Sequence, residues 1–248
     1  MDDSALLLML PPLMLVPVMG LLSMVRSTHK IGQELKRKSF HVCVGLASLS
    51  FPLVLNEPWK AMTAMALAVA WMTAVRILPC LQRHFGSVLQ DCDRKSMGEV
   101  YFALSIGALI LLTPDSPLLY IIPVMILTLA DAAAAIIGRL ISSQPLTGIL
   151  RGKSVAGCTA FFIVAAIICV AMLTIYTDLP AWQITIAALV VATATCLAEA
   201  VSRRGLDNLA IPLVAWSVLS ALKLSAEPAV IAATNFGKSL GLLIGGEW

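Results

Sequence analysis

The sequence predicts an all-α fold, a polytopic integral membrane bundle of about eight or nine transmembrane helices. Hydrophobic residues make up 59% of the chain and charged residues only 12%, whereas soluble domains carry roughly 25% charged residues. The mean hydropathy of +0.93 indicates the same class. Apolar runs recur along all 248 residues, so they leave no room for a separate soluble catalytic domain. Any active site is therefore expected at helix ends and in short loops.

The predicted spans follow one another in a single transmembrane domain, residues 1–248. The first run, 5–25, contains three prolines and follows two aspartates where a secretory signal would carry positive charge, so we expect a retained, kinked span. The Gly-rich tail, 229–244, suits either a ninth span or a re-entrant segment. The runs between these two are 39–55, 61–78, 100–113, 118–137, 155–176, 182–201 and 209–222.

The longest internal loop, residues 79–97, has Leu81, Phe85, Val88 and Leu89 at helical spacing. Polar residues fall between them, a pattern typical of a short amphipathic helix at the membrane interface. Packing of the loop onto the membrane surface is the favoured role, because lids are the rarer use of such loops.

The distribution of Lys and Arg predicts the orientation of the chain in the membrane. With loops alternating between two sides, fourteen of the 17 basic residues fall on one side, while Lys60 and Lys223 fall on the other and Lys238 is not assigned. Positive loops stay cytoplasmic, so the N-terminus is predicted outside and the polar clusters described next face the cytoplasm. The net charge of +3, without a basic stripe interleaved with aromatics, gives no indication of nucleic-acid binding.

A first polar cluster lies at the start of the run 39–55. If the helix begins near Lys36, then Arg37, Lys38 and His41 share one face, with Gly45 one turn deeper. A positive anchor with a buried histidine would explain this pattern, and so would a binding site. A histidine just inside a span needs a partner, so both interpretations stay open.

Asp131 lies nearly two turns inside an apolar helix end, with Ala135 and Gly138 on its face. Small residues in membrane helices usually serve close helix packing. An aspartate beside them is costly to bury, and its carboxylate is the hard oxygen ligand that Mg²⁺ prefers. The pattern therefore favours a functional role for Asp131.

The segment from Gly152 to Gly157 joins a loop to an apolar run, with Ser154 placed to cap the predicted helix. Free N–H groups at a helix start, together with the charge of Lys153, make a phosphate-binding site. The glycine spacing is one residue short of a P-loop and no βαβ unit surrounds it, so a P-loop is excluded.

Two carboxylates flank a predicted tight turn through Gly205, with Glu199 ending one run and Asp207-Asn208 starting the next. Asp207 as a helix cap and Glu199 paired with Arg203 would explain them without function. The alternative is a shared cation, which Asp131 on the same predicted side favours. Glu99, after Gly98, is the weakest candidate because an acidic residue at a helix start complements the helix dipole.

These clusters, in this order, resemble the family of CTP-dependent lipid-alcohol kinases, which includes dolichol kinase, phytol kinase and the CTP-using diacylglycerol kinase. The expected family-like core is about 37–224, preceded by the first span and a basic loop. Family members usually carry a glutamate before the glycine matched by Gly157, where this chain has Ala156. The matching segments are RKSFHVCVG (37–45), GEVYF (98–102), DAAAAIIGR (131–139), GKSVAG (152–157) and EAVSRRGLDNLAIP (199–212).

The resemblance implies transfer of the terminal phosphoryl group of CTP to the hydroxyl of a lipid alcohol in the bilayer, such as an isoprenoid alcohol or diacylglycerol. Phosphoryl transfer depends mostly on positioning and charge neutralisation, here with Mg²⁺. The expected metal ligands are Asp131, Glu199 and Asp207. The expected nucleotide-binding residues are Arg37, Lys38, Asp131, Gly138, Lys153, Ser154, Gly157 and Asn208. The expected catalytic residues are Lys153 and, to orient or deprotonate the acceptor, Asp207 or His41.

Two other functions are weighed against this one. A phosphatidate cytidylyltransferase also uses CTP in the membrane, but the paired Lys-Asp and the His-Gly-Gly of its C-terminal signature do not occur here. A transporter would be expected to carry midplane charges and paired repeats. In this sequence the charges cluster near one predicted surface.

Overall fold

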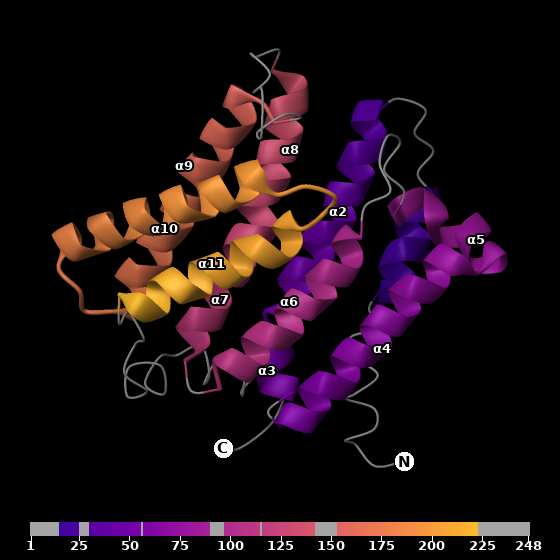
Figure 1. The fold of residues 1–248 in the computed structure, drawn as a ribbon, viewed down its shortest axis with the longest axis horizontal. Coiled ribbons are helices and arrows are strands. Elements are labelled where there is room, and N and C mark those ends of the chain that lie inside the picture. Colours follow the sequence, from indigo (N-terminus) through magenta and orange to yellow (C-terminus); the bar gives the residue numbers. More distant parts are fainter. Residues whose placement is uncertain are drawn as a thin grey trace.

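The computed structural model describes residues 15–24, 30–55, 57–89, 97–114, 116–141 and 153–222, and its elements are helices (Figure 1). This confirms the predicted all-α class. Four helices are long and apolar enough to cross a membrane, as expected of a multi-pass membrane protein. They are Pro58–Ile77, Pro117–Leu140, Val155–Tyr176 and Ala181–Val201. A count of eight or nine spans is not established, because Leu15–Met24, Gly98–Leu112 and Asp207–Ala221 are shorter and the tail 229–244 lies outside the described residues.

The second predicted span takes a different form in the structure. Helix α2 covers Lys30–Ser48 and is followed, after a turn, by the short helix α3, Phe51–Val54. The helix therefore begins before Lys36 and ends before residue 55. Its polar start is supported by an ion pair at i,i+3. Its end is set by Ser48 and Ser50, whose hydroxyls donate to carbonyls three residues back, and by Pro52, which has no backbone N–H to donate to the Ser48 carbonyl.

Helices α4, Pro58–Ile77, and α5, Pro79–Leu89, are separated at Leu78, because a residue before proline disfavours the helical conformation. In α5, Leu81 and Phe85 pack onto a buried apolar cluster, whereas Arg83 is exposed. The predicted amphipathic helix is thus confirmed over α5, and residues 90–96 lie outside the described part.

A continuous helical rod is formed by α7, Pro117–Met125, the π-helical segment η1, Ile126–Ala130, and α8, Asp131–Leu140. Pro123 inside the rod cannot donate a backbone hydrogen bond and disturbs the regular helix. The π-helical turn ends directly before Asp131, and such turns occur frequently at functional sites. Gly45 of α2 packs against this segment, since a Cβ atom there would collide with the Thr128 side chain.

The last part of the described chain contains α9, α10 and α11. Helix α9 has the bounds of the predicted run 155–176. The tight turn between α10 and α11 is confirmed: Arg204 and Gly205 have φ angles of 56° and 88°, the region that glycine adopts without strain. The bounds are Val155–Tyr176 for α9, Ala181–Val201 for α10 and Asp207–Ala221 for α11.

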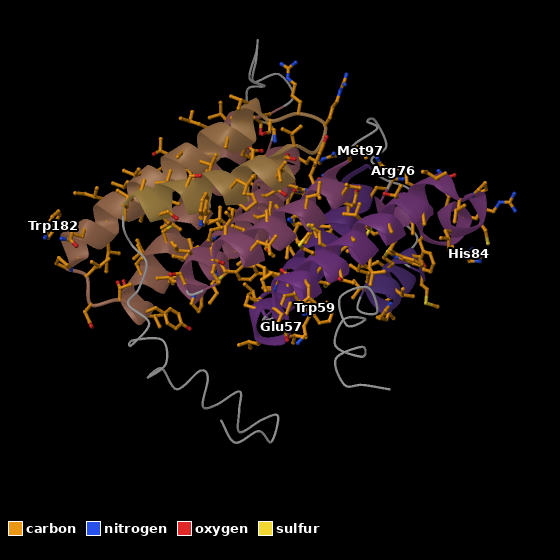
Figure 2. All side chains as sticks on the ribbon, turned by 60° about the horizontal axis from the view of Figure 1, so that its bottom comes forward. Glu57, Trp59, Arg76, His84, Met97 and Trp182 are labelled. Carbon is orange, nitrogen blue, oxygen red and sulfur yellow. The ribbon has the colours of Figure 1, made fainter. Side chains whose placement is uncertain are left out.

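The main apolar core is formed around the central rod by α6 (Gly98–Leu112), α9, α10 and α11. Large apolar side chains also cover the outer faces of α9 and α10, among them Ile163, Ile167 and Ile186. Trp182 projects from the outer end of α10 (Figure 2). A continuous apolar exterior of this kind is what a lipid-facing surface requires.

Candidate functional site

The charged clusters predicted from the sequence meet where several helix ends converge. The rod's α8 lies between α9 and α2 (Figure 1). The α10–α11 turn and the first turn of α11 each contact the start of α6: the Met97 amide donates to the Arg204 carbonyl at 3.3 Å, and Asn208 Nδ2 donates to the Gly98 carbonyl at 2.8 Å. Segments far apart in the sequence therefore form one polar region.

A buried ion pair joins α2 to α8. Lys38 Nζ donates to Asp131 Oδ2, and the two residues are only 4% and 3% exposed. A buried charge without its partner is strongly destabilising, by about 3–5 kcal/mol. Lys38 therefore explains how Asp131 is tolerated inside an apolar rod.

His41 lies beside this ion pair and has the hydrogen-bond partner that is expected of a histidine inside a span. Its Nε2 donates to the Leu127 carbonyl in η1 at 3.0 Å and lies 3.7 Å from Asp131 Oδ2. Phe102 packs edge-on against the ring, with centroids 4.8 Å apart. In neutral His41 the remaining nitrogen, Nδ1, is then the proton acceptor.

A second buried group forms around Lys153, the residue two before α9. Its ammonium pairs with Glu199 at the end of α10 and lies 3.4 Å from Asp207 Oδ2 at the start of α11. Burial disfavours the charged form of Lys153, but the carboxylates of Glu199 and Asp207 outweigh this and raise the pKa of Lys153 to about 12. The ammonium is therefore charged at any physiological pH.

The two ion-pair groups lie within electrostatic range of each other. The charge of Asp131 also contributes to the raised pKa of Lys153. Two ammonium groups, those of Lys38 and Lys153, face the three carboxylates of Asp131, Glu199 and Asp207, which leaves a formal charge of −1. Oε2 of the buried Glu199 has no hydrogen-bond partner among the described residues.

The predicted metal set is divided between the two lysines. Asp131 pairs with Lys38, while Glu199 and Asp207 both contact Lys153. In the described ranges no three His, Cys, Asp or Glu side chains come together as metal ligands would. Within the part of the chain that the structure describes, the feature that suits a hard cation is Glu199 Oε2, which has no hydrogen-bond partner and belongs to a carboxylate that shares Lys153 with Asp207. Metal binding by these residues stays a prediction.

Ser154 caps α9 as predicted, because its Oγ accepts a hydrogen bond from the Gly157 amide at 3.2 Å. Gly138 and Gly157 allow α8 and α9 to touch. A Cβ atom at Gly138 would lie 2.9 Å from Ser154 Oγ, and one at Gly157 would lie 3.0 Å from the Ala134 carbonyl oxygen. Close packing explains both glycines, and contact with a nucleotide stays a prediction.

The change Gly138→Val is expected to destabilise the protein by about 1–3 kcal/mol, because the added methyl groups must displace the Ser154 cap or push α8 away from α9. The thermal unfolding temperature of the purified protein in detergent should fall. Ala66→Val, at an exposed position of α4, is the matched control. Equal unfolding temperatures for the wild type and Gly138→Val would contradict this packing role.

Glu34 is a site residue that sequence reasoning missed. It is 5% exposed and accepts hydrogen bonds from Arg37 at 2.7 Å and from Arg139 at 3.0 Å, which links α2 to α8. Burial disfavours its carboxylate, but the charges of Arg37, Lys38 and Arg139 outweigh this and lower the pKa of Glu34. The one available signal was an acidic residue three positions before Arg37 in a basic segment.

Glu99 faces the end of α4, with Arg76 Nη2 3.6 Å from its carboxylate. Arg76 Nη1 also contacts Met97 Sδ at 2.9 Å, and Figure 2 shows these two residues next to each other. The same view places Glu57 and Trp59 at the opposite end of α4. The polar region therefore extends from the α10–α11 turn to one end of α4.

An apolar pocket, also not predicted from the sequence, adjoins the polar region. Arg37, Lys38, His41, Glu99 and Asn208 line its polar end. The rest of its wall comes mostly from apolar side chains of α2, α4 and α6, together with Leu15, Phe51 and Leu55. No protein family, curated protein or solved structure matches the chain, so the function is argued from this geometry and from the sequence motifs.

Proposed function

We propose that this protein is a membrane kinase that transfers the terminal phosphoryl group of CTP to the hydroxyl of a lipid alcohol. The observation that carries the proposal is that Lys38 and His41 belong to both parts of the site. They contact the buried Asp131 carboxylate and they line the apolar pocket. A reaction between a charged nucleotide and a hydrophobic alcohol requires a charged site that directly adjoins an apolar one.

The phosphate-binding part of the proposed site is Lys153 with the first turn of α9. The amide groups at a helix start and a nearby ammonium both favour phosphate. Mg²⁺, for which Asp131, Glu199 and Asp207 are the proposed ligands, would neutralise phosphate charge when bound. Arg37 and Lys38 of α2 are the proposed additional contacts to the nucleotide phosphates.

For the acceptor hydroxyl, the geometry favours His41 over Asp207. His41 lines the apolar pocket, whereas Asp207 does not and instead lies against the Lys153 ammonium. With Nε2 bonded to Leu127, Nδ1 is the basic nitrogen that would accept the proton of an alcohol.

The change His41→Gln is expected to lower kcat by about a hundredfold, the usual contribution of a general base, with little change in the KM for CTP. Glutamine retains a donor for the Leu127 carbonyl but is not a base. Asp207→Asn is the comparison, with its larger effect expected on the KM for CTP. Steady-state kinetics of lipid phosphorylation would reject this assignment if His41→Gln kept wild-type kcat.

The alternative that shares this geometry is a cytidylyltransferase, which also brings CTP to a membrane lipid. Purified protein should be incubated with CTP labelled either in the α- or in the γ-phosphate, once with a panel of lipid alcohols and once with phosphatidate, the acceptor of a cytidylyltransferase. A kinase moves only the γ-label into the lipid fraction and leaves CDP. Label from the α-phosphate in the lipid would establish the nucleotidyltransferase instead, and unlabelled lipid in both reactions would reject the proposal.

A further inference from the structure

A single buried carboxylate, that of Glu34, holds two arginines from two different helices. Its Oε1 accepts a hydrogen bond from Arg37 Nη2 of α2 at 2.7 Å, and its Oε2 accepts one from Arg139 Nη2 of α8 at 3.0 Å. The Glu34 side chain is 5% exposed, whereas those of Arg37 and Arg139 are 22% and 37% exposed. The carboxylate therefore lies deeper in the protein than the two guanidinium groups that it holds.

The two arginines lie next to different parts of the polar region. Arg37 lines the polar end of the apolar pocket. Arg139 directly follows Gly138, which packs against the amino end of α9 so closely that an added Cβ atom would lie 2.9 Å from Ser154 Oγ. The carboxylate between the two arginines therefore connects the pocket side of α2 with the helix start where phosphate is favoured.

The charge of the Glu34 group differs from that of the two lysine groups. It contains two guanidinium groups and one carboxylate, so its formal charge is +1. The groups of Lys38 and Lys153 together contain two ammonium groups and three carboxylates, so their formal charge is −1. A guanidinium group has five N–H donors in a fixed plane and can bond a carboxylate and a phosphate at the same time. The surplus positive charge and the donor type both favour a phosphate group.

We propose that Glu34 is a positioning residue that holds Arg37 and Arg139 together as a two-arginine binding site for a phosphate group. Arginine side chains that are already held in place lose less conformational entropy when they bind an anion. The identity of the phosphate rests on the proposed function, in which it belongs to the nucleotide. The head group of a phosphorylated lipid offers the same oxygens, so the experiment compares both sources. The pairing of the arginines rests on the ion pairs alone.

The first arm of the test measures the dissociation constant of CTP with Mg²⁺ by calorimetry, using the full chain in phosphatidylcholine nanodiscs without an acceptor alcohol. Glu34→Gln is expected to raise this constant about tenfold, since both guanidinium groups lose a charged hydrogen-bond partner. Arg139→Met should raise it by a similar factor. Glu57→Gln is the matched control, because it removes another ion-paired carboxylate, bonded to Lys60 at 2.6 Å at the far end of α4. It should bind CTP like the wild type.

A double variant separates positioning from a purely structural role. If Glu34 acts through the arginines, the combined variant Glu34→Gln with Arg139→Met should weaken CTP binding by much less than the product of the two single effects. A combined effect equal to that product would overturn the proposal. So would a lowered unfolding temperature of Glu34→Gln with unchanged CTP binding, or tighter binding, which would mean that the carboxylate competes with the phosphate. Arg139 is exposed, so wild-type binding by Arg139→Met overturns the proposal even where Glu34→Gln does not fold.

The second arm measures the retention of phosphatidate on the same variants by native mass spectrometry. Weakened binding of CTP alone assigns the site to the nucleotide, and weakened binding of phosphatidate alone assigns it to a lipid phosphate. Unchanged binding of both would overturn the proposal. CTP binding that depends on Glu34, in a protein that phosphorylates no lipid alcohol, would retain this site and reject the kinase. Lipid phosphorylation with CTP binding that does not depend on Glu34 would do the reverse.

Discussion

Replacing Asp131 by asparagine is expected to lower lipid phosphorylation by at least about a hundredfold, comparable to the loss of one electrostatic stabiliser in an active site. Asp131 is the buried carboxylate between the α2 cations and the Lys153 group. The variant also leaves the Lys38 ammonium buried without its partner, at a cost of about 3–5 kcal/mol. Activity and unfolding temperature must therefore be measured together.

A double variant separates the two effects of Asp131. Lys38→Met with Asp131→Asn removes both buried charges, and such replacements are often neutral for stability. We expect the unfolding temperature of the double variant to recover toward the wild-type value while its activity stays low. Recovery of activity together with stability would contradict a chemical role for Asp131 and leave it as a structural partner of Lys38.

The second large effect is expected from Lys153→Met, which should lower kcat/KM for CTP by about 10²–10³-fold. The ammonium is the only described cation bonded to both Glu199 and Asp207, and it stands at the amino end of α9, where phosphate is favoured. Without it, two carboxylates would repel both each other and the nucleotide. The effect is measured as initial rates over a range of CTP concentrations.

Lys60→Met is the matched control for Lys153→Met. Lys60 also forms a lysine–carboxylate pair, with Glu57 at 2.6 Å, but at the far end of α4 from the polar region. The control variant should keep wild-type kinetics. If both lysine variants lost activity equally, the effect would reflect general loss of charge, and the assignment of Lys153 to phosphate would fail.

The positions of most helices could be predicted from hydropathy and from residues that end helices. The run 155–176 is α9 without adjustment, and Ser154 caps it through the Gly157 amide, because a hydroxyl just before an apolar run satisfies free amides. Gly205 marks the α10–α11 turn through its positive φ. The predicted start of α2, near Lys36, was wrong. The helix begins at Lys30, and its polar first part, which the Glu34–Arg37 ion pair stabilises, gives no hydropathy signal.

The sequence could predict which residues belong to the site, but not which of them form ion pairs with each other. Sequence patterns indicated Asp131, Lys153 and Glu199 because buried charge is costly. They gave no means to pair Lys38 with Asp131, 93 positions away, and the expected metal set therefore grouped carboxylates that the structure divides between two lysines. The apolar wall of the pocket beside His41 is formed mainly by alanine, phenylalanine, methionine, isoleucine and leucine side chains that look like ordinary span residues, so no sequence pattern marks it.

The central claim is that the Lys38–Asp131 and Lys153–Glu199 pairs act as one site, and a double-mutant cycle tests it most directly. Lipid phosphorylation is measured for Asp131→Asn, Lys153→Met and the combined variant. Substitutions of residues that act as a unit have strongly non-additive effects on activity. The combined variant should therefore be about as active as the less active of the two single variants. A combined loss equal to the product of the two single losses would contradict the claim.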